Sequence, residues 1–110
     1  MVTRIPVAMS IDDFFAMPAA VTLRSALEHL QAGFALDVFI LDNGVSASSK
    51  SRLQDSLKEF DVCLEFIPVE KRKLWALYSQ GKSLYPPSAY SRLLIPRLLP
   101  ENIEKIIYLD

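Results

Sequence analysis

The chain has 110 residues, of which 51% are hydrophobic and 23% are charged, and its formal net charge is -1. This balance is typical of one globular domain or of part of one. A nearly neutral chain lacks the concentrated positive field that non-specific nucleic-acid binding needs, so we expect no nucleic-acid partner.

The chain has a single cysteine, Cys63. One cysteine excludes an intrachain disulfide and a thiolate metal cluster. Because Cys63 stands in an apolar stretch, it is expected to be a small buried side chain rather than a nucleophile. The first residues show no signal-peptide pattern, and no run approaches the ~20 apolar residues of a membrane span. We therefore expect a reducing, cytoplasmic setting with no membrane span.

Short apolar runs rich in β-branched and aromatic residues recur along the chain, which is typical of buried strands. The four expected strands are Ile5–Ser10, Ala35–Leu41, Val62–Val69 and Lys105–Asp110. In the third of these runs, apolar residues occupy both of the alternating sets of positions. That strand is therefore expected to be buried on both of its faces.

Helical patterns separate the expected strands. Apolar residues three and four positions apart predict a helix between Ala16 and Phe34, with Phe34 as the last residue of its apolar face. Pro18 suits the first turn of this helix, and Gly33 suits its exit.

A second helix is expected after the turn Asp42–Gly44, with Ser46 or Ser48 as its N-cap. Its apolar face consists of Leu53, Leu57 and Phe60. A third helix is expected at Ser88–Leu94, where Pro96 would end or redirect it.

This alternation of strands and helices predicts the fold class. It is an α/β fold with a Rossmann-like parallel sheet, right-handed crossovers and helices flanking both faces. We expect a single domain over residues 1–110, with the loop Gly81–Pro87 as the candidate hinge.

Acidic residues follow three of the four expected strands. Asp12 and Asp13 follow the first strand, Asp42 follows the second, and Asp110 ends the fourth. The carboxyl ends of parallel strands meet at one edge of the sheet, so these side chains are expected to share that edge. Clustered carboxylates suit a hard cation such as Mg²⁺ or Mn²⁺. Acids at these positions also suit the N-termini of helices, so the pattern alone leaves both interpretations open.

Other kinds of site fit the sequence less well. A phosphorylatable receiver domain places its acceptor aspartate after the third strand, where this chain has Glu70. A Ser-His-Asp triad would depend on the one histidine, His29, near the end of a predicted helix. The sequence contains neither the GxGxxG dinucleotide fingerprint nor a GxSxG nucleophile motif.

Five segments together resemble glycosyltransferase family eight, whose members have a GT-A-type nucleotide-sugar-binding fold and include lipopolysaccharide galactosyl- and glucosyltransferases and glycogenin. The segments are SIDDFF, VFILDNGVS, LEFIPV, SAYSRLLIPRLLP and KIIYLD. They occur in the family's order and at similar spacing over residues 4–110. The combination of the last two segments is the specific part of this resemblance.

The resemblance implies retaining transfer of a hexose from a UDP-sugar, such as UDP-glucose or UDP-galactose, with assistance from Mn²⁺ or Mg²⁺. By position, Ser10 and Asp12 match residues that contact the uracil, and Asp12 would accept from the base N–H. Phe15 matches an aromatic residue that stacks on the uracil. Arg92 matches an arginine near the diphosphate and donor sugar. Asp110 matches the first aspartate of the metal-binding D-x-D motif.

The chain departs from the family pattern in two ways. Phe14 stands where the family commonly has an asparagine, and Phe15 lacks the hydroxyl of the usual tyrosine. The second aspartate of the D-x-D motif would stand two positions after Asp110. We therefore expect an amino-terminal fragment of a glycosyltransferase, truncated within that motif and inactive alone.

Two further expectations concern structure rather than catalysis. Asp13 is expected to cap the first helix, and Arg92 is expected to pair with an acid such as Asp12 when no ligand is bound. The alternative to an enzyme fragment is a non-catalytic interaction module. Such a module would self-associate through strand edges or an apolar surface.

Overall fold

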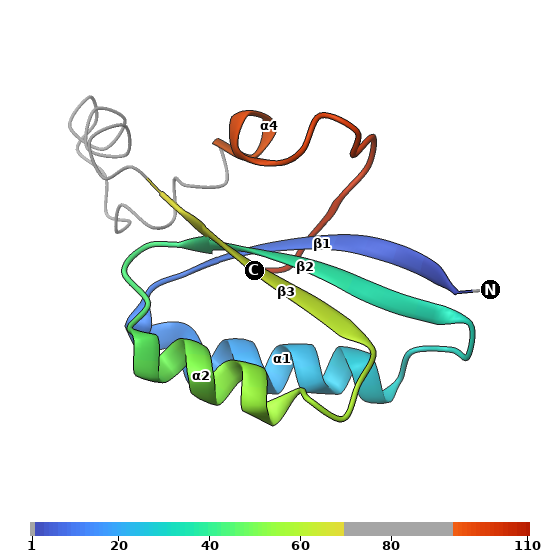
Figure 1. The fold of residues 1–110 in the computed structure, drawn as a ribbon, viewed down its shortest axis with the longest axis horizontal. Coiled ribbons are helices and arrows are strands. Elements are labelled where there is room, and N and C mark those ends of the chain that lie inside the picture. The colour runs from blue at the N-terminus through green and yellow to red at the C-terminus, as the bar shows by residue number, and fades with distance from the viewer. Residues whose placement is uncertain (1, 70–93) are drawn as a thin grey trace.

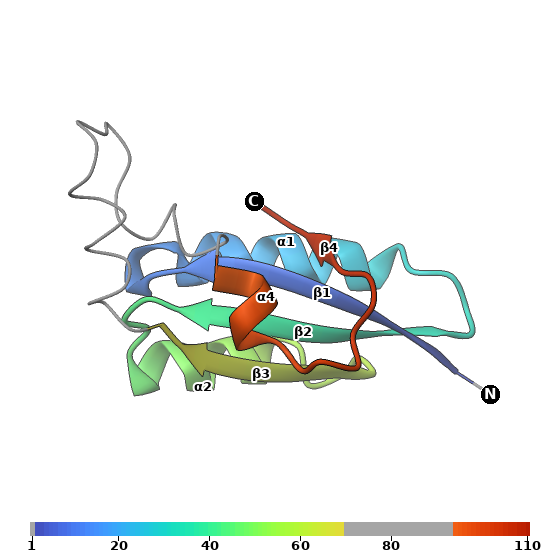
Figure 2. The same cartoon turned by 90° about the horizontal axis from the view of Figure 1, so that it is seen from above.

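The computed structural model describes residues 2–69 and 94–110. In these residues four parallel strands form one sheet in the order β3-β2-β1-β4 (Figures 1 and 2). The strands are β1 (Thr3–Ile11), β2 (Phe34–Asp42), β3 (Val62–Pro68) and β4 (Ile107–Tyr108). Because β1 pairs in parallel with both β2 and β4, the carboxyl ends of these strands point in one direction.

Helices lie on both faces of the sheet, as expected for a Rossmann-like α/β fold (Figure 1). One face is covered by α1 (Ala16–Glu28) and α2 (Ala47–Ser56), and the short α4 (Ile95–Leu98) lies on the other. A 3₁₀ turn, η1 (Asp13–Phe15), joins β1 to α1. Among the described residues, no helix is long and apolar enough to cross a membrane.

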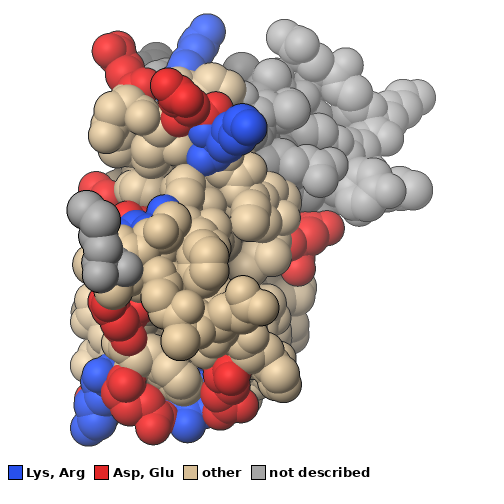
Figure 3. Space-filling view, turned by 90° about the vertical axis from the view of Figure 1, so that its right-hand side faces the viewer, with Lys and Arg blue, Asp and Glu red and all other residues tan. Residues whose placement is uncertain are grey.

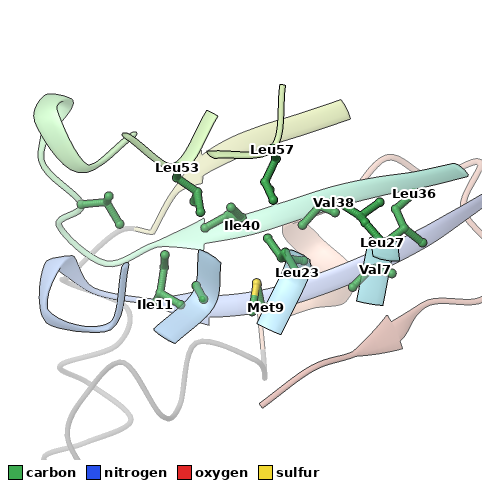
Figure 4. Close-up of a cluster of buried hydrophobic side chains, with 12 residues drawn as sticks. Val7, Met9, Ile11, Leu23, Leu27, Leu36, Val38, Ile40, Leu53 and Leu57 are labelled. Atoms are coloured by element: carbon green, nitrogen blue, oxygen red, sulfur yellow. The ribbon is translucent and has the colours of Figure 1, made fainter. Parts of the chain in front are cut away.

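The main core lies between the sheet and the pair α1 and α2 (Figure 4). Successive side chains of a strand point to opposite faces, so alternate residues of β1 and β2 reach this layer. The buried residues at its centre are Val7, Met9, Ile11, Leu23, Leu36, Val38, Ile40, Leu53 and Leu57. A second, smaller cluster on the other face joins Leu41 of β2 to Val69 and Leu94.

The first helix is shorter than its apolar pattern predicted. It ends at Glu28, and Gly33, with a φ of 90°, turns the chain into β2. Glycine adopts this left-handed conformation without the steric cost that other residues meet. Phe34 was expected on the helical face, but it is the first residue of β2. The prediction failed because Phe34 kept the helical spacing of the apolar residues by coincidence, although it lies beyond the end of the helix.

The expectation that β3 is buried on both faces is wrong for the described structure. Val62, Leu64 and Phe66 pack against the main core, whereas Cys63 and Glu65 on the other face are exposed. The strand is at the edge of the sheet, and on this outer face Ile67 is partly buried against the smaller cluster while the positions of Cys63 and Glu65 are left open. Cys63 is therefore not the buried hydrophobic residue that its apolar neighbours predicted.

Charged side chains join the strands at their amino ends. Arg4 Nε lies 2.7 Å from Asp37 Oδ1, and Arg4 Nη1 lies 3.2 Å from Asp61 Oδ1. Arg4 Nη2 also donates to Cys63 Sγ at 3.3 Å. Figure 3 shows this side of the molecule, where acidic and basic side chains lie close to one another around an uncharged area.

The carboxyl-terminal part differs in detail from its prediction. The strand expected at Lys105–Asp110 is reduced to Ile107–Tyr108, although Leu109 N still donates to Ala8 O at 2.8 Å. Pro96 stands in the first turn of α4, where proline is tolerated. The expected helix Ser88–Leu94 and the candidate hinge Gly81–Pro87 lie outside the described residues, apart from Leu94.

The second helix also ends before its predicted limit. Ser46 is its N-cap, and Ser46 Oγ accepts a hydrogen bond from Ser49 N at 3.1 Å, as expected. The helix ends at Ser56, so Phe60 lies beyond it. Phe60 still packs against the main core, which explains why it matched the apolar pattern.

Candidate functional site

A pocket of about 380 Å³ opens at the carboxyl end of β1. Its walls are formed by the end of β1, by η1 with the first turns of α1, and by β4 with the residues that follow it. Four residues identified in the sequence as candidate site residues line this one pocket: Ser10, Asp12, Phe15 and Asp110. The parallel pairing of β1 with β4 brings Asp110 to the same pocket as Asp12, although they are far apart in the sequence.

Asp12 fixes the chain where β1 becomes η1. Its backbone is extended, with a φ of -107°, and its Oδ1 accepts from Phe15 N at 3.1 Å. This is the bond of an N-cap, and it adds to the backbone bond that Phe15 N makes to Asp12 O at 3.2 Å. Within the described residues, no hydrogen bond engages the second carboxylate oxygen of Asp12. One oxygen of Asp12 therefore serves the fold, and the other can accept from a ligand in the pocket.

Phe15 presents an apolar ring to the same pocket. The bond to Asp12 holds its backbone, and the residue is 49% exposed. The neighbouring ring of Phe14 meets the Phe15 ring edge to face, with 5.4 Å between the centroids. Phe14 itself lies outside this pocket and lines a groove between α1 and α2. The two phenylalanines therefore face different surroundings.

The sequence predicted that Asp13 caps the first helix, and this prediction is wrong. Asp12 caps the preceding turn η1, the N-cap of α1 is Phe15, and Asp13 Oδ1 accepts from Ser46 N, at the N-cap of α2, at 2.9 Å. Hydrogen bonds from Ser49 and Ser46 hold the pKa of Asp13 below its ordinary value. The prediction chose the wrong helix because the contact joins residues 33 positions apart.

Asp42 is the one buried acid among the described residues, with 8% of its side chain exposed. Its Oδ1 accepts from Gly44 N and Val45 N at 2.9 and 2.6 Å, and its Oδ2 lies 2.8 Å from Lys50 Nζ. Burial alone would raise the pKa of Asp42, but Lys50 and the two amides outweigh it and lower the pKa. Asp42 therefore joins β2 to α2 and does not reach the pocket.

The four acids thus do not form the cluster that the sequence pattern suggested. Asp12 and Asp110 line the pocket, whereas Asp13 and Asp42 are bound by the amino end of α2. In residues 2–69 and 94–110, no group of three or more His, Cys, Asp or Glu side chains is placed to hold a metal ion. Asp110 is an exposed carboxylate, and a single carboxylate suits a cation that is held mainly by substrate phosphates.

The sequence reasoning missed three residues of this region. Thr22 and Tyr108 line the pocket. Thr22 follows Pro18 by four positions, so both lie on one side of α1, and this spacing was the available signal. Asn43, assigned to a turn, donates from Nδ2 to Ser10 Oγ at 2.9 Å. Arg92, expected near a diphosphate, lies outside the described residues.

Comparison with known proteins identifies the family. The model of the family described as "Glycosyl transferase family 8" matches residues 6–110, nearly the whole chain. The chain belongs to glycosyl transferase family 8. The resemblance found in the sequence motifs is thereby confirmed.

The chain is also similar to individual proteins. General stress protein A of Bacillus subtilis (strain 168) is 28% identical over 102 residues, which are 90% of this chain and 34% of that protein. Among solved structures, the bifunctional glycosyltransferase WbbM in its apo form has a TM-score of 0.75 and 26% identity. The galactosyltransferase LgtC, in complex with donor and acceptor sugar analogues, has a TM-score of 0.76 and 19% identity.

This chain corresponds to a part of each of these proteins. It spans about a third of general stress protein A, 19% of the WbbM chain and 37% of the LgtC chain. The structural match to LgtC covers 96% of this chain. The observed sheet with its flanking helices is thus the Rossmann-like part of a GT-A-type fold.

The lowered pKa of Asp42 predicts a loss of stability in acid. A carboxylate whose pKa is depressed in the folded state contributes stability above its unfolded pKa of 3.8, and this contribution is lost as the pH falls through the folded pKa. We expect the melting temperature to decrease once the pH is lowered below about 4. In Asp42→Asn, which keeps an oxygen for Gly44 N and Val45 N, the acid-dependent fall should be smaller.

The measurement is thermal unfolding between pH 7 and pH 3, followed by circular dichroism. Asp55→Asn is a suitable control because Asp55 is 77% exposed on α2 and lies 3.8 Å from Lys58. Equal acid-dependent falls in the parent chain and in Asp42→Asn would contradict the prediction.

Proposed function

We propose that this chain is the nucleotide-binding, amino-terminal part of a retaining glycosyltransferase that transfers a hexose from a UDP-sugar with Mn²⁺ assistance. The proposal rests on one observation, namely that Ser10, Asp12, Phe15 and Asp110 line the same pocket. These four residues came from segments at opposite ends of the sequence. Their meeting at the carboxyl edge of a parallel sheet is what a nucleotide site in an open α/β fold requires.

The base half of the proposed site rests on complementary chemistry. Uracil has two π faces and an imide N–H between two carbonyl groups. The half-exposed ring of Phe15 offers a surface on which the base stacks. The second oxygen of Asp12 offers an acceptor for the imide N–H. A volume of about 380 Å³ is within the range of small-ligand pockets.

The diphosphate half of the proposed site rests on Asp110. This exposed carboxylate lines the pocket to which Asp12 belongs. A Mn²⁺ or Mg²⁺ ion held by Asp110 and by phosphate oxygens would act as a Lewis acid towards the departing diphosphate. In the D-x-D pattern the second aspartate would stand two positions further on, outside these 110 residues. Arg92 belongs to the proposal as a donor to the phosphates or the donor sugar.

The remaining parts of the proposal concern the substrates and the setting. The donor is UDP-glucose or UDP-galactose, the acceptor is a carbohydrate, and the reaction belongs to lipopolysaccharide biosynthesis in the cytoplasm. The structural similarity to LgtC, a galactosyltransferase whose structure holds donor and acceptor sugar analogues, supports a hexose donor. We propose that the chain alone binds the nucleotide without turning over the sugar.

A second candidate function is a folded interaction module that self-associates. Phe14, Met17 and Val21 are 85%, 73% and 65% exposed, and they follow one another at steps of three and four residues. This spacing places them along one side of η1 and α1, so they form an exposed apolar stripe. Ile107 of the short strand β4 is also exposed. These features favour association with a second copy of the chain.

Replacement of Phe15 tests the base half of the site. We expect Phe15→Ala to raise the Kd for UDP about tenfold, because stacking on an aromatic ring contributes on this scale to base binding. Phe15→Tyr should keep the affinity, since it keeps the stacking face. The measurement is isothermal titration of the chain with UDP in the presence of MnCl₂.

Phe14→Ala is the matched control, since Phe14 is an adjacent and more exposed ring outside the pocket. Its Kd should stay close to that of the parent chain. If the parent chain binds no UDP, the proposed function fails. If Phe14→Ala weakens binding as much as Phe15→Ala does, the assignment of Phe15 to the base fails.

Replacement of Asp110 tests the metal half. In the parent chain, MnCl₂ should strengthen UDP binding relative to EDTA, because the cation would join the carboxylate to the diphosphate. Asp110→Asn should lose this gain and keep the affinity measured in EDTA. Asp55→Asn, an exposed acid outside the pocket, should behave like the parent chain. A full Mn²⁺ gain in Asp110→Asn would count against Asp110 as a metal ligand.

Light scattering with size-exclusion chromatography tests the second candidate. If the apolar stripe mediates association, the apparent mass should rise with concentration above 12.4 kDa, and Met17→Glu should restore the monomer. Arg97→Glu adds an acid on α4, away from the stripe, and should leave association unchanged. A monomeric parent chain at high concentration would exclude this candidate.

A further inference from the structure

A groove lies between α1 and α2, beside the turn η1. Its volume is about 340 Å³, close to the volume of about 380 Å³ of the pocket at the end of β1. The groove and the pocket have no lining residue in common. Figure 1 shows the two helices next to each other on one face of the sheet. This groove is therefore separate from the proposed nucleotide site, and what it binds does not depend on nucleotide binding.

Short side chains create the groove. Where the helices face each other, α1 has Ala16 and Ala20, and α2 has Ser49 and Ser56. Helical residues four or seven positions apart lie on one side of the helix, so each pair lines the space between the two helices. Leu53 also lines the groove, and as part of the main core it closes the groove on the side of the sheet. Longer side chains at the four positions would fill this space, whereas alanine and serine leave it open.

Apolar side chains border the groove on the side of η1 and α1. Phe14 and Met17 line it, and they are 85% and 73% exposed. A ligand that covers them removes apolar surface from water, which stabilises the complex. Neighbouring exposed apolar residues of this kind are typical of ligand-binding grooves. The chemistry of this side therefore favours a ligand with an apolar part.

The α2 side of the groove carries a cation, Arg52. Its side chain is exposed, and in the part of the chain that the structure describes no acid forms an ion pair with it. Asp13, the acid at the same groove, is held by hydrogen bonds from Ser46 and Ser49 instead. Arg52 is thus a charged group that the groove offers to a ligand. A guanidinium has a fork of donors that fits a carboxylate or phosphate group.

We propose that this groove is a second binding site, which takes a small molecule with an apolar body and one anionic group. The body lies between the helices and covers Phe14 and Met17, and the anionic group accepts from the Arg52 guanidinium. The apolar side chains and the cation come from opposite sides of the groove, so one molecule contacts both. The volume of about 340 Å³ is within the range of small-ligand pockets.

A second copy of the chain matches the groove less well. The apolar stripe of Phe14, Met17 and Val21 carries no charge. A copy that packs through this stripe would bring no anion to Arg52, and covering an unpaired guanidinium costs free energy. Charge complementarity therefore favours a small anion as the occupant.

Two fluorescent probes test the two parts of this proposal. Anilinonaphthalene sulfonate has an apolar aromatic body and one anionic group, and phenylnaphthylamine is the same body without the sulfonate. We expect Arg52→Gln to raise the Kd of the sulfonate about fivefold, the scale of an exposed ion pair, and to leave the Kd of the uncharged probe unchanged. Phe14→Ala should raise both Kd values, because it removes an apolar wall. Both residues are exposed, so we expect both variants to fold, which circular dichroism checks.

Arg97→Gln is the matched control, since Arg97 is an exposed arginine on α4, outside the groove. It should leave both Kd values unchanged. The titrations are repeated in Phe15→Ala, which alters the pocket at the end of β1, and there the effect of Arg52→Gln should persist. The proposal fails if Arg52→Gln has no more effect than Arg97→Gln, or if it weakens both probes equally. Either failure leaves the proposed function standing, and absence of UDP binding would leave the groove site standing.

A measurement on the parent chain needs no variant. Salt screens the interaction between exposed charges, so added NaCl should weaken binding of the sulfonate relative to the uncharged probe. Equal responses of the two probes would contradict the role of Arg52. Light scattering at the same concentrations reports on the other occupant. A dimer that binds neither probe would assign the groove to a second copy and overturn the proposal.

Discussion

The parallel pairing of β1 on both of its edges is the constraint on which the other features depend. β2 and β4 both run in the direction of β1, with Val7 opposite both Val38 and Ile107. A strand in this position is shielded on both faces, which is why Val7, Ala8 and Met9 are buried. The same polarity brings the end of β1, the start of α1 and the residues after β4 to one edge of the sheet. A pocket at this edge follows from strand direction, whereas the chemistry of the pocket depends on the individual side chains there.

Neighbouring backbone amides determine what each acid at this edge does. Asp42 and Asp13 are engaged by donors at or just before the amino end of α2, and these donors hold the pKa of each acid below its ordinary value. Asp12 gives one oxygen to Phe15 N, and Asp110 remains exposed at the pocket. Acids of one type, at equivalent ends of parallel strands, therefore divide into structural residues and candidate ligand-binding residues. The division follows from the number of hydrogen-bond donors within reach.

Local patterns predicted those features that depend on local sequence. The strands β1 and β2 and the N-cap at Ser46 were predicted because apolar runs and capping serines act over a few residues. The convergence of Asp12 and Asp110 followed from a parallel sheet and from the family resemblance. The exposure of Cys63 was not predictable, since it depends on the edge position of β3. The partner of Asp13 and the contact between Asn43 and Ser10 join distant residues, and periodicity carries no information about such contacts.

The register of β1 with β4 has a consequence for the order in which the pocket is completed. Residues 9–22, which supply the β1 and α1 walls, are close in sequence, and contacts among them close short loops. The remaining wall requires β4 to pair with β1, with Tyr108 beside Ala8. Contacts between residues so far apart form slowly, because bringing them together costs the entropy of closing a long loop. The wall that carries the base-stacking ring is therefore expected to form early in folding, and the wall that carries Asp110 is added last.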